Sequence, residues 1–460
     1  MEMRFTHSAR RAAGVSATAL ALLVMGACDN PQDTLLEQQQ PQVILPADVQ
    51  NPTGAVGLYT GALGRLRSEL NGGNGNQEAL WNLMSLMTDE FKSGDTFSQR
   101  NDADQRTTQT NDAQLSPIYT SLQQARGYSR TALGYLQQYK PTSSNAQQAE
   151  MLFTIAFAEM QLGEDFCNGI ALGETVNGVP QYTAPLAAKD VFTAALARVD
   201  SGLALATGAD AATMQVKNAL LITKGRLLVD LGQFPAAAAA VAAVPVTFQY
   251  AGTYSQTTND NGWWIMTTSS KRYTVGDSVD AAGRIDNAIP FVSAKDPRVP
   301  TTANGKGFDT TTPFVGQSIW NRDDPIAIVD GLDGQLIQAE AKLNASDIAG
   351  MTAILNALRA APPTQGIFKP SGALAPLTAP LTQDAAVSLY FREKAFWTFG
   401  RGQRLGDLRR LVRQYGRSQD KAYPSGTFFK NGSYGTRVAF PVPDRDKANQ
   451  QFTGCMDTNA

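Results

Sequence analysis

The sequence predicts a mostly α-helical protein in which paired helices form a scaffold and one long irregular segment interrupts them. From Pro52 onward, apolar residues recur at three- and four-residue steps, the period of an amphipathic helix. Two stretches, residues 225–241 and 339–358, place small and large residues in the register of tetratricopeptide (TPR) helix pairs. Residues 249–320 are instead rich in Thr, Ser, Gly, Asn and Asp. We therefore expect a TPR-like scaffold that carries long, irregular loops suited to ligand binding.

The composition limits the chemistry that this chain can perform. Hydrophobic residues make up 43% of the 460 residues, which is ample for a core, and the formal net charge is −2. Nucleic-acid-binding domains usually carry a basic surplus, so we expect no nucleic-acid partner. The one histidine, His7, lies in a segment that we expect to be removed. That removal excludes Ser-His-Asp and Cys-His catalysis and His-ligated metals, and we expect no metal or cofactor, whereas paired carboxylates could still support a glycosidase mechanism.

Residues 1–27 have the features of a signal peptide. Arginines at positions 4, 10 and 11 precede an apolar run, residues 15–24, that is too short to span a bilayer. Met25-Gly26-Ala27-Cys28 then matches a lipobox, in which Cys28 becomes the lipidated N-terminus. The alternative is an ordinary secretory signal that is cleaved nearby. Residues 28–50 begin polar and Gln-rich, as flexible tethers do, so we expect attachment to the membrane through the N-terminal lipid only.

We assign residues 51–460 to a single domain. Its TPR-like helices cover about 51–245 and 329–360 and flank the 249–320 insert, and residues 361–460 form a C-terminal region of helices and loops. In the first TPR-like stretch, small residues such as Gly225 let paired helices approach, and large ones such as Phe234 fill the groove between pairs. The alternative is a generic helical hairpin. Before that stretch we expect helices at 52–70, 77–90, 117–139, 149–163 and 191–205.

The 249–320 insert is the first candidate for a ligand site, because a loop this long in a compact protein is usually functional. Its aromatic residues stand among Asn, Asp and Arg, and this combination suits sugar recognition: rings stack on the C–H faces of a pyranose, and polar groups bond its hydroxyls. The alternative is that the tryptophans pack the loop on the helices. The candidate ligand-binding residues here are Trp263, Trp264, Arg272, Tyr273 and Trp320.

A second candidate loop spans residues 89–112, between two expected helices. Phe97 and Arg100 are its candidate ligand-binding residues. Its Asp-rich run at 101–104 resembles a calcium loop but lacks the glycine and the final glutamate of an EF-hand, so we expect no metal there. Elsewhere, Cys167 and Cys455 are the cysteines left once Cys28 is acylated. In an exported protein such a pair favours a disulfide, and two separate thiols are the alternative.

Residues 390–411, YFREKAFWTFGRGQRLGDLRRL, predict two helices broken at a glycine pair. Gly400 and Gly402 can adopt the positive φ that a helix C-cap requires. Arginines crowd this join, and we interpret them as structural partners of carboxylates and helix carbonyls rather than as a phosphate-binding patch. The run R-E-x-x-F-W…G-x-R-x-x-D-L-R-R resembles the C-terminal signature of SusD/RagB-type outer-membrane lipoproteins. Further markers, in that family's order, are the 149–163 helix, the 225–241 repeat, Asp296-Pro297-Arg298, the 336–341 helix and Phe440-Pro441-Val442-Pro443.

The resemblance implies a fold and a function. SusD-like proteins carry a TPR-like scaffold with long inserts, and they are non-enzymatic, nutrient-binding lipoproteins on the outer face of the outer membrane. A SusD-like protein is the lid of a SusC-like TonB-dependent transporter and delivers an oligosaccharide or a peptide to it. Two rival functions stay open for this chain. One is a TPR-type envelope scaffold lipoprotein that binds no nutrient, and the other is a carboxylate-based glycoside hydrolase.

Overall fold

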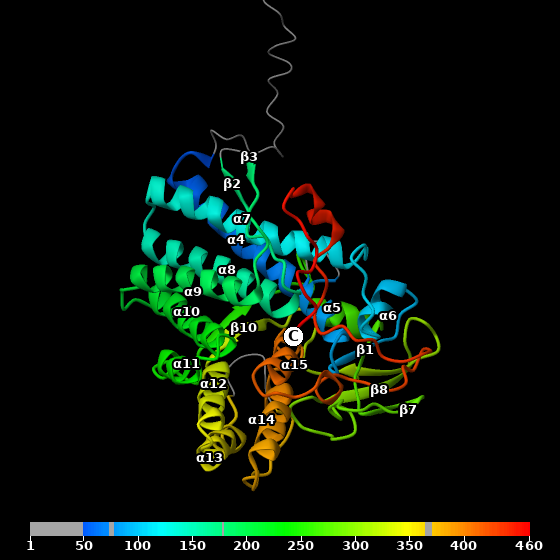
Figure 1. The fold of residues 1–460 in the computed structure, drawn as a ribbon. Coiled ribbons are helices and arrows are strands. Elements are labelled where there is room, and N and C mark those ends of the chain that lie inside the picture. Colours follow the sequence, from blue (N-terminus) through cyan, green and yellow to red (C-terminus); the bar gives the residue numbers. More distant parts are fainter. Residues whose placement is uncertain (1–48, 73–77, 177–178, 364–369) are drawn as a thin grey trace, which may run out of the picture. The chain divides into compact units, whose positions relative to one another are not determined.

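The computed structural model describes residues 49–72, 78–176, 179–363 and 370–460 (Figure 1). Residues 51–460 form one structural unit by their internal contacts. The predicted signal peptide, Cys28 and most of the predicted tether lie outside the described residues. None of the helices in the described ranges combines the length and the apolar character that crossing a membrane requires.

The first part of this unit is a stack of helices in which each packs on the next (Figure 1). The stack comprises α4 (Pro52–Asn71), α7 (Leu115–Tyr139), α8 (Ser144–Asp165), α9 (Ala188–Leu205), α10 (Ala211–Asp230) and α11 (Phe234–Val241). Helix α8 is central and buried over most of its length. Its neighbours come so close that a Cβ atom on Gly163 would lie 2.5 Å from Cε1 of Phe192 in α9. Helix α5 (Leu80–Leu86) is shorter than the helix predicted at 77–90, because the chain turns after Leu86 toward a strand.

The two predicted TPR-like pairs are present as helix pairs. Helix α10 packs on α11, and α12 (Gly331–Asn344) packs on α13 (Ile348–Ala360) (Figure 1). The small position of the first repeat lies where three helices meet: a Cβ on Gly225 would be 2.5 Å from Cγ1 of Val241 and 2.9 Å from Cδ1 of Ile337. The small residue predicted at position 225 from the TPR pattern therefore does lie at a close contact between helices. The prediction of a mostly helical, TPR-like scaffold is confirmed.

Short antiparallel two-stranded ladders organise the segments between the helices. Two ladders join distant parts of the chain: β1 (Phe91–Ser93) pairs with β5 (Tyr273–Val275), and β4 (Gln249–Gly252) pairs with β10 (Ile326–Asp330). The β1–β5 ladder connects the two loops predicted to carry a ligand site. The other elements of these segments are α6 (Ser98–Asp104), β2 (Glu174–Val176), β3 (Val179–Gln181), the π-helix η1 (Trp264–Ser269), β6 (Val279–Asp280), β7 (Gly283–Arg284), β8 (Thr301–Lys306) and β9 (Pro313–Gln317).

The C-terminal run folds as predicted into two helices, α14 (Gln383–Trp397) and α15 (Arg404–Arg413), broken at a glycine pair. Gly400 and Gly402 both have φ of 67°, which only glycine adopts easily. Two short 3₁₀ turns, η2 (Gln419–Lys421) and η3 (Asp444–Ala448), follow.

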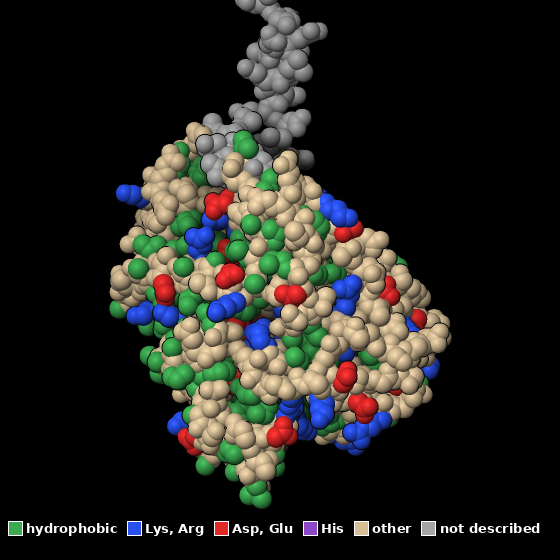
Figure 2. All heavy atoms as spheres, in the orientation of Figure 1, with side chains coloured by type: hydrophobic (Ala, Val, Ile, Leu, Met, Phe, Trp, Pro, Cys, Tyr) green, Lys and Arg blue, Asp and Glu red, His purple; other side chains and the backbone are tan. Residues whose placement is uncertain are grey.

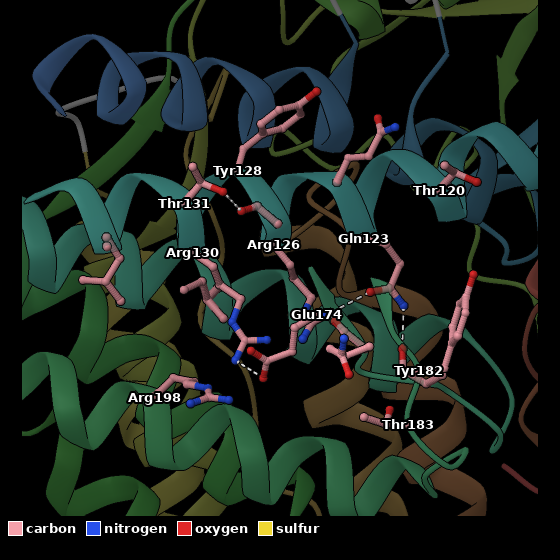
Figure 3. Close-up of a pocket in the computed structure, with 18 of the residues that line it drawn as sticks. Thr120, Gln123, Arg126, Tyr128, Arg130, Thr131, Glu174, Tyr182, Thr183 and Arg198 are labelled. Carbon is pink, nitrogen blue, oxygen red and sulfur yellow. Dashed lines mark hydrogen bonds and ion pairs between the residues drawn. The ribbon is translucent and has the colours of Figure 1, made fainter. Parts of the chain in front are cut away.

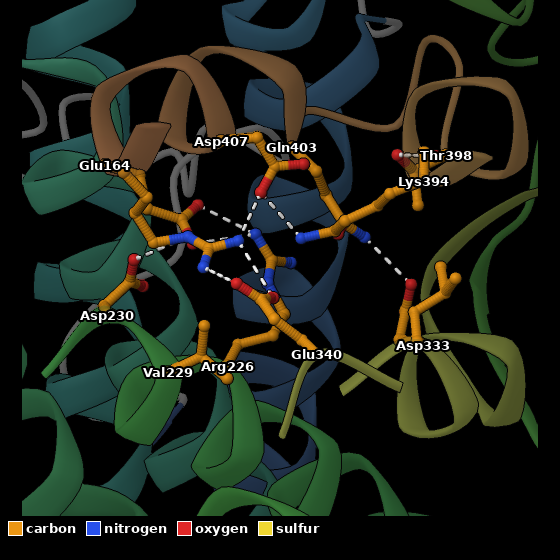
Figure 4. A network of polar contacts seen from close by, with 12 residues as sticks. Glu164, Arg226, Val229, Asp230, Asp333, Glu340, Lys394, Thr398, Gln403 and Asp407 are labelled. Atoms are coloured by element: carbon orange, nitrogen blue, oxygen red, sulfur yellow. Dashed lines mark hydrogen bonds and ion pairs between the residues drawn. The ribbon is translucent and has the colours of Figure 1, made fainter. Parts of the chain in front are cut away.

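The arginines of this run are structural, as interpreted from the sequence. Arg410 pairs with Glu340 and Asp407, and Arg404 forms two 2.7 Å hydrogen bonds with Asp89. Figure 4 shows the buried network around Asp407, Glu340 and Glu164 at the junction of these helices with α8, α10 and α12. These charges lie inside the molecule, and Figure 2 shows the remaining charges of both signs scattered among other side chains on the face drawn.

A disulfide joins Cys167, just after α8, to Cys455 in the C-terminal segment, as predicted for this pair. The two Cα atoms are 5.6 Å apart. Next to it, Cys167 donates its backbone N–H to the carbonyl of Phe440 at 2.8 Å. The C-terminal segment is therefore held on the helical scaffold by both a covalent bond and hydrogen bonds.

Candidate ligand-binding site

The structure separates the predicted ligand-binding residues into a buried group and an exposed group. Four of them have less than a tenth of their surface exposed: Trp263 (0%), Tyr273 (0%), Trp320 (3%) and Arg100 (6%). Phe97 is 44% exposed, and Trp264 and Arg272 are partly exposed. Ligand contact in this structure is therefore open to the second group only.

The expectation that the tryptophans of the insert project as sugar-stacking rings is wrong for Trp263 and Trp320. The Trp263 ring stacks between Phe91, with ring centroids 4.4 Å apart, and Trp320, with ring centroids 6.1 Å apart. Its indole N–H donates to the carbonyl of Gly400 at 2.8 Å. Burial with a satisfied indole N–H is the favourable arrangement for tryptophan. These two rings pack the insert onto the C-terminal helix break, which is the alternative that the sequence left open.

Tyr273 and Arg100 belong to a buried polar cluster beneath the surface. The Tyr273 hydroxyl donates to Glu78, and Arg100 donates to both oxygens of Glu78 at 3.0 and 2.9 Å. Arg100 also donates to Asp95 at 2.6 Å. Each charge in this cluster is paired, as buried charges must be. Neither side chain offers a free polar group to a ligand.

Three side chains form an exposed surface above this cluster, which we call the Arg272 platform: Phe97, Arg272 and Phe308. The guanidinium carbon of Arg272 lies 3.8 Å from the ring centroid of Phe308 and 5.1 Å from that of Phe97. Phe97 is 44% exposed and Phe308 is 45% exposed. Arginine stacks well on aromatic faces, and the contact fixes the relative position of the rings.

Backbone hydrogen bonds bring the three segments of the Arg272 platform together. The Gly94 N–H donates to the carbonyl of Arg272 at 2.8 Å, and the carbonyl of Gly94 accepts from the Asp309 N–H at 2.9 Å. Phe308 donates its N–H to the carbonyl of Lys271 at 2.9 Å. The approach requires glycine, since a Cβ on Gly307 would lie 2.9 Å from the Gly94 oxygen. The Arg272 platform is therefore built on interlocked backbone rather than on free loops.

Asp95 fixes Arg272 from below and stays ionised. It accepts two hydrogen bonds from Arg272 Nη1, at 2.9 and 2.7 Å. Burial disfavours the charged carboxylate, but the hydrogen bonds from Arg272, the Phe97 N–H and Arg100 outweigh burial, so the pKa of Asp95 lies below its ordinary value. A glycosidase acid requires a raised pKa, so Asp95 is not suited to that role.

Residues from the C-terminal segment complete the polar border of the Arg272 platform. Lys430 pairs with Asp309 at 2.8 Å and donates to Asn101 Oδ1 at 2.9 Å. The ring of Phe429 lies near two ammonium groups, with its centroid 5.1 Å from Lys92 Nζ and 5.8 Å from Lys430 Nζ. The Arg272 platform thus has apolar faces at its centre and amide, ammonium and carboxylate groups beside them, which is the chemistry that sugar binding requires.

Trp264 lies in a different local environment. Its ring is covered by Arg322, whose guanidinium carbon is 5.1 Å from the ring centroid, and Arg322 pairs with Asp260 at 2.7 Å. The structure therefore gives Trp264 a partner of its own, and its role in ligand binding stays a prediction.

Sequence reasoning missed Phe308 and Phe429. Phe308 stands in a Gly- and Thr-rich turn of the insert, between β8 and β9, and a lone aromatic residue in such a turn was the available signal. Phe429 lies far from both predicted loops in sequence, so only the fold could place it there. In the part of the chain that the structure describes, no group of three or more His, Cys, Asp or Glu residues is arranged to hold a metal ion.

Comparison with known proteins shows what class of fold this is. No family model matches the sequence, and no curated protein matches it. Solved structures do match: a SusD superfamily protein from Bacteroides fragilis has 13% identity and a TM-score of 0.61, with 88% of this chain and 99% of that chain covered. A SusD-like carbohydrate-binding protein from Bacteroides vulgatus has 11% identity and a TM-score of 0.60, with 87% and 97% covered.

A third similar structure is described as a laminarin-binding SusD-like protein, with 14% identity, a TM-score of 0.59, and 88% and 99% of the two chains covered. The molecule is thus a helical-repeat scaffold with a loop-borne candidate site. More specifically, its fold is that of the SusD-like proteins over most of its length, and the predicted SusD/RagB-like fold is confirmed.

Proposed function

We propose that this chain is a SusD/RagB-type nutrient-binding lipoprotein that captures an oligosaccharide on the Arg272 platform. The observation that carries the proposal is the pair of half-exposed rings, Phe97 and Phe308, which both lie next to the Arg272 guanidinium in a SusD-type fold. This arrangement offers a sugar two kinds of contact. The rings stack on pyranose faces, and the amide, ammonium and carboxylate groups around them bond hydroxyls. An oligosaccharide is favoured over a peptide because two similar structures are described as binding carbohydrate or laminarin.

The proposal includes the cellular role. Cys28 carries the lipid, residues 28–50 act as a tether, and the protein works on the cell surface at the outer membrane as the lid of a SusC-like TonB-dependent transporter. The lipobox-like sequence before Cys28 and the SusD-type fold support this part. Cys28→Ala should release the protein from the outer-membrane fraction. Affinity purification of the wild-type protein from outer membranes should recover a large TonB-dependent barrel, and recovery of no such barrel would contradict the lid role.

Binding is tested with purified protein and soluble laminarin, a neutral α-glucan and a casein peptide mixture. Each half-exposed ring that a sugar covers contributes about 1 kcal/mol or more, by analogy with burial of part of a Phe side chain. Removing both rings in a Phe97→Ala/Phe308→Ala variant should therefore weaken glycan binding about 30-fold or more. The matched control is Leu381→Ala, because Leu381 is 99% exposed on another segment. Unchanged affinity in the double variant would contradict the site.

The same experiment separates the two rivals. An envelope scaffold that binds no nutrient would show no affinity for any member of the panel. A glycoside hydrolase would release reducing ends from the bound glycan, which a binding protein does not do. Binding of the peptide mixture alone would replace the oligosaccharide by a peptide as the ligand.

A further inference from the structure

A concave surface lies on the helical scaffold, on elements that do not contribute to the Arg272 platform. A cavity of about 760 Å³ opens between α7, α8, α9, the β2–β3 segment and residues near η3 (Figure 3). Its size falls within the range of small-molecule sites, about 300–1,000 Å³. We call it the α7–α9 groove. Apolar side chains, Leu152 and Ile155 of α8, line part of it, and the rest of its lining is mostly polar.

Three arginines converge in the α7–α9 groove. Arg126 donates to Glu159 at 3.0 Å, and Arg130 pairs with Glu174 at 2.6 Å. For Arg198 of α9, the described residues provide neither an ion pair nor a hydrogen bond. Figure 3 shows Arg130 and Arg198 extending from opposite helices toward the same space, with Glu174 beside them. This end of the groove therefore carries more positive charge than its carboxylates neutralise.

The three arginines of the α7–α9 groove repel one another, and this repulsion affects the pKa of Arg126. Burial lowers the pKa of Arg126 most; Glu159 opposes this effect, and the positive charges of Arg130 and Arg198 lower the pKa further. The remaining carboxyl of the wall, Asp446, accepts a hydrogen bond from the Tyr119 hydroxyl at 3.0 Å.

Some polar atoms that line the α7–α9 groove also lack a hydrogen-bond partner among the described residues. Nη1 of Arg130, Nε of Arg198 and Oγ1 of Thr183 are buried and have no hydrogen-bond partner among the described residues. Buried polar groups are nearly always bonded, so groups of this kind call for a specific partner. Two rings border the same groove, Tyr128 and Tyr182, and they are 52% and 51% exposed.

We propose that the α7–α9 groove binds an acidic oligosaccharide, with a uronic-acid carboxylate pairing with Arg198 and Arg130 and a sugar face stacking on Tyr182. Guanidinium groups recognise carboxylates through paired N–H donors, and an exposed tyrosine ring suits the C–H face of a pyranose. A peptide is less suited, because extended peptides are held mainly by strand backbone, whereas the polar part of this lining consists mostly of arginine, tyrosine, glutamine and threonine side chains. The proposed site is independent of the Arg272 platform.

The test uses the purified full-length protein and calorimetric titration with trigalacturonate, a neutral maltotriose and triglutamate. Trigalacturonate should bind the wild type, and raising the salt concentration should weaken that binding. Arg198→Gln should weaken it about tenfold or more, since a charge-assisted pair is lost. Because Arg198 has no ion pair or hydrogen bond with the residues that the structure describes, the variant should keep the wild-type melting temperature. Arg284→Gln is the matched control, since the Arg284 side chain is 82% exposed elsewhere.

Each other outcome overturns the proposal. Wild-type protein that binds none of the acidic probes, or an Arg198→Gln variant with unchanged affinity, removes the site. Equal affinity for triglutamate and trigalacturonate removes the carbohydrate assignment and points to an acidic peptide. The Phe97→Ala/Phe308→Ala variant should bind trigalacturonate normally, so failure of this proposal and failure of the Arg272 platform are distinguishable.

Discussion

The glycine break between α14 and α15 gives the sharpest test of how this fold is held together. Gly402 has φ of 67° and faces Trp81: a Cβ atom there would lie 2.0 Å from the indole Nε1. Gly416, just beyond α15, has φ of 66° and nothing within 4 Å of the same position. The two glycines thus share a backbone conformation and differ in crowding. Gly402→Ala and Gly416→Ala therefore form a matched pair of variants.

The expected magnitudes follow from these contacts. A left-handed alanine costs about 1 kcal/mol in both variants. At Gly402 the added methyl must also displace Trp81, which is fully buried and donates to Gln161 at 2.7 Å. Overpacking of this kind costs about 1–3 kcal/mol, and straining a buried hydrogen bond adds about 1 kcal/mol. We expect Gly402→Ala to lose about 3–5 kcal/mol of unfolding free energy, against about 1 kcal/mol for Gly416→Ala.

Urea unfolding followed by tryptophan fluorescence measures the difference, because the midpoint shifts while the denaturant slope stays constant. A gap of at least about 2 kcal/mol between the two variants is expected from the crowding term. Equal losses would refute the reasoning, since they would show that Trp81 does not pack against the helix break.

Three further predictions concern the same core. Removing the disulfide with Cys455→Ser should lower the unfolding free energy by about 2–4 kcal/mol, because the bond closes a long loop of the unfolded chain, and reducing agent should have no further effect on the variant. Arg298→Ala should cost about 3 kcal/mol, because it removes a buried guanidinium that pairs with both Asp296 and Glu393, each at 2.7 Å, and leaves Arg359, at 2.8 Å, as the close partner of Glu393; thermal melting checks this value. Burial raises the pKa of Glu90 to about 8, so the folded protein holds a proton that the unfolded chain releases, and stability should fall from about pH 4.5 to about pH 8. Glu90→Gln should lack this contribution. Urea unfolding of both proteins at several pH values checks this prediction: if the carboxyl were not protonated, the unfolding free energies of wild type and variant would change with pH in the same way.

The scaffold could be predicted because its signals are local. Helix periodicity and the spacing of small residues lie within one or two helices, and Gly225 shows how directly such a position reports a close contact. The glycine pair and the arginines of the C-terminal run were interpretable for the same reason, since positive φ and carboxylate pairing are properties of those residue types. The β1–β5 ladder was not predictable, because it joins residues 91–93 to residues 273–275, which are far apart in the sequence, and its short strands have no period to detect.

The candidate site shows where local reasoning stops. Residue types in the two loops indicated aromatic and arginine chemistry, and the loops do meet. Whether a given ring faces solvent was decided by distant residues: Gly400 accepts the Trp263 indole N–H, and Phe91 stacks on its ring. Nothing in the sequence of the insert records those partners. Phe308 was missed because a single aromatic residue in a polar turn carries little signal by itself.

Buried residues of the insert and of the 89–112 loop position the exposed ones. Tyr273, the first residue of β5, enters the core, while Arg272, which immediately precedes the strand, stays partly exposed. Glu78 bonds Tyr273 and Arg100, Asp95 bonds Arg100 and Arg272, and these links fix the guanidinium on which both exposed rings stack. A binding surface that is already ordered loses little conformational entropy when it meets a ligand. Tyr273, which the sequence predicted as a ligand contact and which proved to be buried, therefore helps to hold Arg272 in one geometry through Glu78, Arg100 and Asp95.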